Sequence, residues 1–205
     1  MGLIARARYR LAHAWQARRL GALGARSAVM RPEMIGGGEG ILVGADVTIR
    51  PHARLECVRD GGFRGEIHIG DGTDAQLYLH VGAAERVTIG RKVLIAGRVY
   101  ISDHDHDWPD PTMLKLVVAP VAIGDGCWLG EGSCVLKGVT LGAGCIVGAN
   151  AVVTRSFPER CMLVGVPARA IKRFDPAAGA WRGCGPRGEP IDAAGGGRDA
   201  GRAGA

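Results

Sequence analysis

The chain has 205 residues, of which 47% are apolar, with 34 glycines, six cysteines and a formal net charge of +6. This length and apolar content suit one domain with a sizeable core. The sequence contains neither a run of about eighteen apolar residues nor a signal-peptide pattern, which argues against a membrane-spanning helix and favours a soluble cytoplasmic protein. The cysteines show no CxxC spacing, so we interpret them as structural rather than as metal ligands or disulfides.

Residues 1–40 form a basic segment that is predicted to be helical at its start and to continue as a linker. Seven arginines precede the first acidic residue, Glu33. Over residues 3–23, Ile4, Leu11 and Trp15 fall on one apolar stripe, which is typical of an amphipathic helix. We interpret this helix as a cap over the first coil of the domain; a peripheral contact with the anionic inner face of a membrane is the alternative. Nucleic-acid binding is not expected, because no basic-aromatic pattern follows.

A six-residue repeat dominates residues 121–153. A branched aliphatic residue returns at every sixth position and is usually followed by a small residue; these positions are Ile123, Leu129, Val135, Leu141, Val147 and Val153. A period of six fits neither an amphipathic helix nor a simple alternating strand. Three such units complete a coil of about eighteen residues, which buries its apolar face only by stacking on the next coil. The repeat therefore predicts a parallel β-helix in an all-β protein.

The same register continues upstream and sets the expected domain limits. It is clear at Ile69, Ile89, Ile95 and Ile101 and fainter before them, which predicts a β-helical domain over residues 41–174. Residues 107–120 contain three prolines and keep no register, so we expect a loop that protrudes from the stack and carries function. Residues 175–205 are rich in Gly, Ala and Arg and are predicted to be a flexible, disordered tail.

The segment before the predicted loop carries the most chemistry. Ser102, Asp103, His104, Asp105 and His106 follow one another directly. A histidine beside acidic residues, next to a loop that can exclude water, is suited to accept a proton from a substrate hydroxyl. A β-helix by itself names no reaction, so the function has to be inferred from such a site.

Three segments resemble the hexapeptide-repeat acyltransferases, in particular the galactoside and maltose O-acetyltransferases and the O-acetyltransferases of surface polysaccharide assembly. They are Ile123-Gly124-Asp125-Gly126-Cys127-Trp128-Leu129-Gly130, the stretch 146–155 and the motif Val164-Gly165-Val166-Pro167-Ala168-Arg169. The resemblance covers about residues 67–174. It implies a left-handed β-helix that assembles as a homotrimer with active sites between subunits, acetyl-CoA as co-substrate, a sugar or glycan acceptor, and no metal.

The resemblance also assigns roles to residues. Counted forward in hexapeptides, the unit that begins at Ile101 ends on His106, where sugar acetyltransferases carry their catalytic histidine. His106 is thus the expected general base, with Trp128 lining the cleft and backbone N–H groups after Trp128 stabilising the oxyanion. The expected coenzyme contacts are Gly148, Ala149, Thr154, Arg155, Arg169, Lys172 and Arg173, the basic residues among them meeting the phosphates. The expected acceptor contacts are Gln76, Asp103 and His104.

Other functions stay open from the sequence. N-acylation of an amino sugar or nucleotide sugar would use the same base and coenzyme. A non-catalytic scaffold would not need a histidine, a tryptophan and a basic cluster together. A γ-class carbonic anhydrase could use His80, His104 and His106, but the spacing of the last two is wrong for its zinc ligands. Gln76 and Ala83 stand where the small-sugar acetyltransferases carry acidic and amide residues, so a simple galactoside or maltose is not the expected acceptor.

Overall fold

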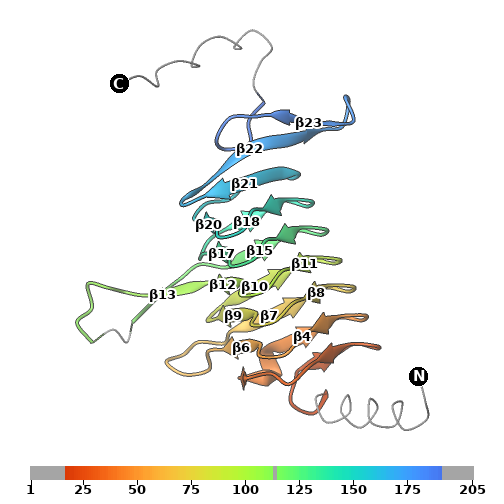
Figure 1. Ribbon diagram of the computed structural model, residues 1–205. Helices are drawn as coiled ribbons and strands as arrows, with labels where there is room; N and C mark the ends of the chain where they lie inside the picture. The colour runs from red at the N-terminus through yellow and green to blue at the C-terminus, as the bar shows by residue number, and fades with distance from the viewer. Residues whose placement is uncertain (1–16, 113–114, 191–205) are drawn as a thin grey trace, which may run out of the picture.

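The computed structural model describes residues 17–112 and 115–190, which form a single stack of coils (Figure 1). Each of six successive coils contributes one short strand to each of three parallel sheets, so the stack is a three-sided prism. We call these sheets A, B and C, in the order in which a coil passes through them. The predicted parallel β-helix is confirmed.

Every strand in sheets A and C pairs with the equivalent strands of neighbouring coils. Sheet A contains β1 (Ala22–Leu23), β4 (Ile41–Val43), β7 (Glu66–Ile69), β10 (Arg86–Ile89), β15 (Val121–Ile123) and β18 (Thr140–Leu141). Sheet C contains β3 (Met34–Gly36), β6 (Arg54–Cys57), β9 (His80–Ala83), β12 (Tyr100–Ser102), β17 (Cys134–Val135) and β20 (Val152–Val153). A short 3-10 turn, η1 (Gly38–Gly40), joins the first coil to the second.

Sheet B is longer, because three further strands follow the last full coil. It contains β2 (Ala28–Val29), β5 (Thr48–Ile49), β8 (Asp74–Ala75), β11 (Leu94–Ile95), β16 (Trp128–Leu129), β19 (Ile146–Val147), β21 (Cys161–Gly165), β22 (Ala168–Asp175) and β23 (Ala180–Gly183). The last two strands turn back antiparallel.

The aliphatic residues of the repeat point into the prism, as predicted. Ile123, Leu129, Val135, Leu141 and Val147 are each at most 2% exposed, and the upstream residues of the same register are buried as well. Because these strands are only two to four residues long, each coil gains its burial and its hydrogen bonds from the coils above and below. The core is therefore a continuous apolar column along the axis of the stack.

The N-terminal limit of the prism differs from the prediction. Strand pairing begins at β1, where Ala22 and Leu23 pair with Leu42 and Val43, so the stack starts one coil before residue 41. Consequently the predicted helix over residues 3–23 cannot extend to its proposed end, and most of it lies outside the described residues. Within the described ranges, no helix has the length and apolar character needed to cross a membrane.

The C-terminal limit also differs, because residues 175–190 are not a structureless tail. β22 and β23 form an antiparallel hairpin in which Phe174 packs edge-on against Trp181, with ring centroids 5.7 Å apart. Arg160 lies over the Phe174 ring at 5.6 Å. This hairpin continues sheet B past the last coil, and the aromatic contacts give it a packed face. The rest of the predicted tail, residues 191–205, lies outside the described residues.

Two excursions leave the prism at the same corner, between sheets C and A. The longer one lies between β12 and β15 and is an antiparallel hairpin of β13 (His104–His106) and β14 (Leu116–Val118), which projects from the side of the stack (Figure 1). The predicted loop, residues 107–120, thus contains the strand β14. The excursion itself starts earlier than predicted, because β13 already belongs to it. The shorter excursion, residues 58–65, lies between β6 and β7 two coils earlier and was not predicted.

The packing predicts that two neighbouring residues on β10 contribute very differently to the free energy of unfolding. Ile89 is 1% exposed and points into the core, whereas Thr88 points to the outer face. We expect Ile89→Ala to lower the free energy of unfolding by about 2–5 kcal/mol, because it leaves a cavity that the stacked coils cannot close. Thr88→Ala should change it by less than about 1 kcal/mol. Denaturant unfolding measures both, and equal losses would contradict the inward register.

Candidate active site

Both candidate histidines lie on the first strand of the projecting hairpin. His104 pairs with Val118 and His106 with Leu116 across β13 and β14. The chain leaves the coil at Asp103, so the hexapeptide register that led to His106 does not continue to that residue. This corrects the counting argument: His106 is a residue of the hairpin and is exposed, not the closing residue of a repeat.

Asp103 is the buried anchor at the point where the hairpin leaves the prism. Its side chain is 0% exposed. Oδ1 accepts the backbone N–H of Ala84 at 2.7 Å, and Oδ2 accepts those of Glu85 and Arg86 at 2.8 and 2.7 Å. The sequence assigned Asp103 to acceptor binding, but a buried carboxylate with both oxygens occupied cannot contact an acceptor. Its role is to hold the corner of the third coil against the base of the hairpin.

Asp103 also fixes the ring of His104. The distance from His104 Nδ1 to Asp103 Oδ1 is 2.8 Å. Burial by itself raises the pKa of Asp103, but the hydrogen bonds from His104, Ala84 and Glu85 outweigh it and hold that pKa below its ordinary value. The ring lies over Gly82, where an added Cβ would stand 3.3 Å from His104 Cε1. A side chain at Gly82 would therefore crowd the imidazole, which leans against the outer face of sheet C.

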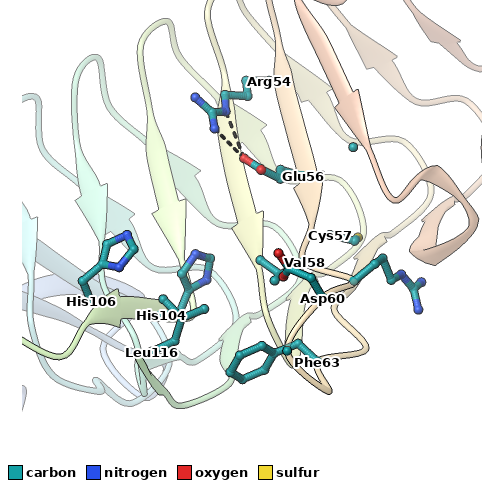
Figure 2. Close-up of a pocket in the computed structure, with 12 residues that line it drawn as sticks. Arg54, Glu56, Cys57, Val58, Asp60, Phe63, His104, His106 and Leu116 are labelled. Carbon is teal, nitrogen blue, oxygen red and sulfur yellow. Dashed lines mark hydrogen bonds and ion pairs between the residues drawn. The ribbon is translucent and has the colours of Figure 1, made fainter. Parts of the chain in front are cut away.

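The histidines open onto two adjoining depressions. The larger has a volume of about 800 Å³ and lies between the hairpin and the 58–65 excursion; the smaller, of about 210 Å³, lies over the outer face of sheet C. Both are lined by Arg54, Glu56, His104 and His106, so these four side chains stand where the two depressions meet. Figure 2 shows the histidines on the hairpin side and the Arg54–Glu56 pair on β6. Of the predicted acceptor contacts, His104 is therefore at the candidate site.

Sequence reasoning missed the opposite wall of the larger depression. Arg54 and Glu56 come from β6, and Arg59, Asp60 and Phe63 come from the 58–65 excursion. The available signal was the loss of the six-residue period between the second and third coils, together with the Gly61-Gly62 turn. The faint register in that part of the chain hid the interruption.

Trp128 lies on a different face of the prism. It is 52% exposed on the outer side of sheet B, in a row with Leu94 and Ile146 of the neighbouring coils. It lines neither of the two depressions beside the histidines. Gln76 is likewise separate, in a depression of about 250 Å³ with Tyr78 and Glu131. Within one chain, the predicted catalytic histidine and tryptophan are therefore not brought together.

The expected oxyanion donors after Trp128 are largely used by the fold. The N–H groups of Gly130, Gly132 and Ser133 donate to the carbonyls of Val147, Gly97 and Gly130 at 2.8, 2.9 and 3.1 Å. These bonds stack the coil on its neighbours and close its turn. The prediction that backbone groups of this coil stabilise an oxyanion is therefore wrong for these three residues.

The predicted coenzyme residues divide between two sheets. Gly148 and Ala149 follow β19, and Arg169 and Lys172 lie on β22, all on sheet B, whereas Thr154 and Arg155 follow β20 on sheet C. Lys172 pairs with Met162 and Arg169 with Val164, so both basic side chains stand on the same outer face. The stack leaves little room for a side chain at Gly148, because an added Cβ would lie 3.0 Å from Val164 Cγ1 and 3.2 Å from the Leu163 carbonyl oxygen.

Arg173 departs from the predicted basic cluster. It pairs with the buried Cys161, on the opposite face of β22 from Lys172. Its Nε donates to the carbonyl of Glu159 and its Nη1 to that of Gly188, both at 3.3 Å. These bonds tie the C-terminal hairpin to the last turn of the prism, which gives Arg173 a structural position.

The proposed zinc ligands of the carbonic anhydrase interpretation lie near one another without forming a metal site. In residues 17–112 and 115–190, no three His, Cys, Asp or Glu side chains are arranged to hold a metal ion. His80 packs edge-on against Tyr100 on sheet C, with ring centroids 4.9 Å apart. Burial, and then the nearby Arg54 charge, lower the pKa of His80, so this side chain is neutral at physiological pH.

Comparisons with known proteins place the chain among acyltransferases. Residues 120–155 match the family described as the hexapeptide repeat of succinyl-transferase. The chain is 40% identical over 133 residues to WbbJ of Escherichia coli K12, which carries the name of a lipopolysaccharide-biosynthesis O-acetyl transferase; the match covers 60% of this chain and 68% of WbbJ.

Solved structures agree with this placement. A galactoside acetyltransferase in complex with coenzyme A superposes with a TM-score of 0.56 at 29% identity, over 66% of each chain. A variant of AntD, an N-acyltransferase from Bacillus cereus, superposes with a TM-score of 0.68 at 19% identity, over 80% of this chain and 90% of AntD. At that identity the likeness to AntD concerns the fold.

The Asp103 anchor predicts a specific dependence of stability on pH. Asp103→Asn should lower the free energy of unfolding at pH 7 by roughly 1–3 kcal/mol, because buried N–H groups lose a charged acceptor. Since the folded-state pKa is depressed, the ionised carboxylate stabilises the fold above the unfolded value of about 3.9, and this contribution is lost as the pH falls through the lower folded-state pKa. The difference between wild type and variant should therefore shrink below about pH 4.

Urea unfolding at several pH values measures this difference, with Asp105→Asn as the control. Asp105 is exposed on β13 and pairs with Lys137, so its variant should unfold like the wild type throughout. The anchoring role would be contradicted if Asp103→Asn had the same free energy of unfolding as the wild type at pH 7, or if the difference between them grew as the pH falls.

Proposed function

The chain belongs to the hexapeptide-repeat acyltransferase family, and we propose that it is an acetyl-CoA-dependent O-acetyltransferase that modifies a hydroxyl of a sugar or surface glycan. One structural observation carries this proposal: two histidines project from a hairpin into a depression whose other wall carries a polar Arg54–Glu56 pair and an aromatic ring. The identity to WbbJ and the likeness to the coenzyme A complex of galactoside acetyltransferase support the coenzyme and the class of acceptor.

In the proposed reaction, His106 accepts the proton of an acceptor hydroxyl while that oxygen attacks the thioester carbonyl carbon of acetyl-CoA. The new C–O bond forms, the C–S bond breaks, and the coenzyme A thiolate takes up the proton. His106 suits this role because it is exposed at the depression, whereas Asp103 holds the Nδ1 of His104. His104 then shapes the acceptor side of the site. A positioned base of this kind requires no covalent enzyme intermediate.

The coenzyme is proposed to lie along the outer face of sheet B. An apolar row formed by Leu94, Trp128, Ile146 and Met162 crosses successive coils there and ends at Lys172 on β22. Such a row suits the pantetheine arm, and Lys172 with Arg169 offers positive charge to the phosphates. Ala149, at the turn after β19, borders the same face.

We further propose a homotrimer with a left-handed coil, in which the site is completed between subunits. Within one chain, Trp128 stands on sheet B and the histidines project beside sheet C, so a cleft that uses both needs a second copy. The same argument applies to Thr154 and Arg155, which follow a strand of sheet C. The hairpin, with Trp108 83% exposed near its tip, is the segment that would reach the neighbouring subunit.

The two histidines provide the first test. His106→Ala should lower turnover by roughly 10²- to 10⁴-fold while acetyl-CoA affinity stays unchanged, as expected for loss of a general base. His104→Ala should cost less and act mainly on the Michaelis constant for the acceptor. Release of the free thiol of coenzyme A measures turnover, and calorimetry measures coenzyme binding. A dead His104→Ala beside a nearly normal His106→Ala would transfer the role of base to His104, with Asp103 as its orienting partner.

Hybrid oligomers test the shared site. His106→Ala and Trp128→Ala should each be nearly inactive alone. When the two variants are co-expressed, about a quarter of the interfaces in randomly mixed oligomers should contain both wild-type residues and regain activity. Separately purified variants that are mixed without subunit exchange are the control. Hybrids that stay inactive would contradict a site built from His106 of one subunit and Trp128 of another.

A further inference from the structure

The wall opposite the histidines has a hydrogen-bonding group available for a ligand. Arg54 and Glu56 alternate along β6, so both side chains stand on the outer face of sheet C. Arg54 Nε and Nη2 donate to Glu56 Oε2 at 3.1 and 2.6 Å. Both bonds end on one oxygen, and within the described ranges Glu56 Oε1 has no hydrogen-bond partner. Because Glu56 lines both depressions, this oxygen can accept a hydrogen bond from a ligand hydroxyl beside the histidines.

The charged side chains around the site leave no surplus of positive charge. Arg54 is hydrogen-bonded to Glu56, whereas Arg59 forms an ion pair with Glu39 at 3.3 Å in which the buried Arg59 Nε makes no hydrogen bond to the described residues. Three carboxylates line the depressions, those of Glu56, Asp60 and Asp105, and Asp105 is paired with Lys137. His80 adds no charge at neutral pH, because burial lowers its pKa. A phosphate or carboxylate ligand that binds Arg54 would therefore have to displace Glu56, and it would also approach the carboxylate of Asp60.

An apolar surface lies beside these polar groups. Phe63 on the 58–65 excursion and Leu116 on β14 line the larger depression, and Figure 2 shows both near its lower end, away from Arg54. A pyranose ring presents hydroxyls at its edge and C–H groups on its faces. A paired arginine and carboxylate offers donors and an acceptor together, and a phenyl ring offers a surface for the C–H groups. The volume of about 800 Å³ is in the upper part of the range for ligand sites, so more than one sugar unit fits.

We propose that this depression binds an uncharged hexose unit of an oligosaccharide or glycan, with Glu56 and Phe63 as the residues that determine acceptor specificity. The site discriminates against sugar phosphates, nucleotide sugars and uronic acids. The proposal rests on the O-acetyltransferase function above, since the hydroxyl that reaches His106 belongs to the sugar held by Glu56 and Phe63.

The test is direct binding, measured by ligand-observed NMR on the full-length protein saturated with coenzyme A. The probes are matched sets in the gluco and galacto series: methyl hexosides and their trisaccharides, the corresponding uronic acids, and the hexose 1-phosphates. We expect a neutral trisaccharide to bind best and the charged counterparts to bind at least tenfold more weakly. Glu56→Gln and Phe63→Ala should each weaken the neutral probe roughly tenfold, the size of one lost hydrogen bond or aromatic contact.

Glu66→Gln is the matched control. Glu66 also pairs with one arginine, since Arg86 Nε and Nη2 lie 3.2 and 3.0 Å from its Oε2, but it stands on β7 of sheet A and lines neither depression. Its variant should bind every probe like the wild type. Glu56→Gln should in addition narrow the preference for neutral over charged probes, because it removes a negative charge and frees Arg54; a merely structural role for Glu56 would not change that preference.

The outcomes separate this proposal from the one on which it rests. Equal or tighter binding of the charged probes, unchanged binding in Glu56→Gln and Phe63→Ala, or no binding of any sugar would each overturn the specificity proposal. If coenzyme A still binds and acetyl-CoA is consumed with a charged or an amino acceptor, the acyltransferase function stands and only the neutral-hexose assignment fails. If coenzyme A itself does not bind, the proposed function fails.

Discussion

A strand of two to four residues cannot bury an apolar face or satisfy its backbone by itself, and every part of this molecule depends on how the chain meets that constraint. Each coil takes its hydrogen bonds and its buried contacts from the coils above and below it. The inward positions are therefore restricted to aliphatic and small residues, such as Ile89, Ile101 and Leu129. Polar residues that bind or react with a ligand are therefore confined to outward positions and to places where the chain leaves the prism.

The two excursions show how the prism gives rise to a site. Both leave at the corner between sheets C and A, one from the second coil and one from the fourth, so they flank the tight corner of the third coil at Ala84 and Glu85. Asp103 connects these parts, because its carboxylate accepts the N–H groups of that corner and contacts the His104 ring. A depression with two walls results, one from each excursion, on a rigid base formed by sheet C.

The sequence predicted the features that repeat and the longer of the two interruptions, but it missed the first coil, the 58–65 excursion and the C-terminal hairpin. A six-residue period reports an inward side chain directly, so the parallel β-helix and its core could be read from residues such as Ile123 and Leu141. The first coil was missed because, of its inner positions Leu23 and Val29, only Leu23 is followed by a glycine, and this pair, Leu23-Gly24, stands at the end of a stretch that was predicted to be helical. The C-terminal hairpin was missed because Phe174 and Trp181 stabilise it by a contact across strands, which composition does not reveal. Asp103 looked like a ligand contact because burial cannot be seen in a motif.

The division of the candidate residues between faces is itself informative about how such a prism can catalyse. A stack of short strands has flat outer sheets, and aliphatic side chains fill its axis. A deep, water-excluding cleft therefore has to come from projecting segments or from a second prism packed alongside. In the proposed reaction, the hairpin and the 58–65 excursion would form a polar wall for the acceptor, and the apolar row through Leu94, Trp128 and Ile146 would bind the extended thioester on a separate face. If two prisms pack side by side, the polar wall of one subunit and the apolar row of the other would meet at the subunit boundary. The base and the thioester would then lie close together without any change in the prism.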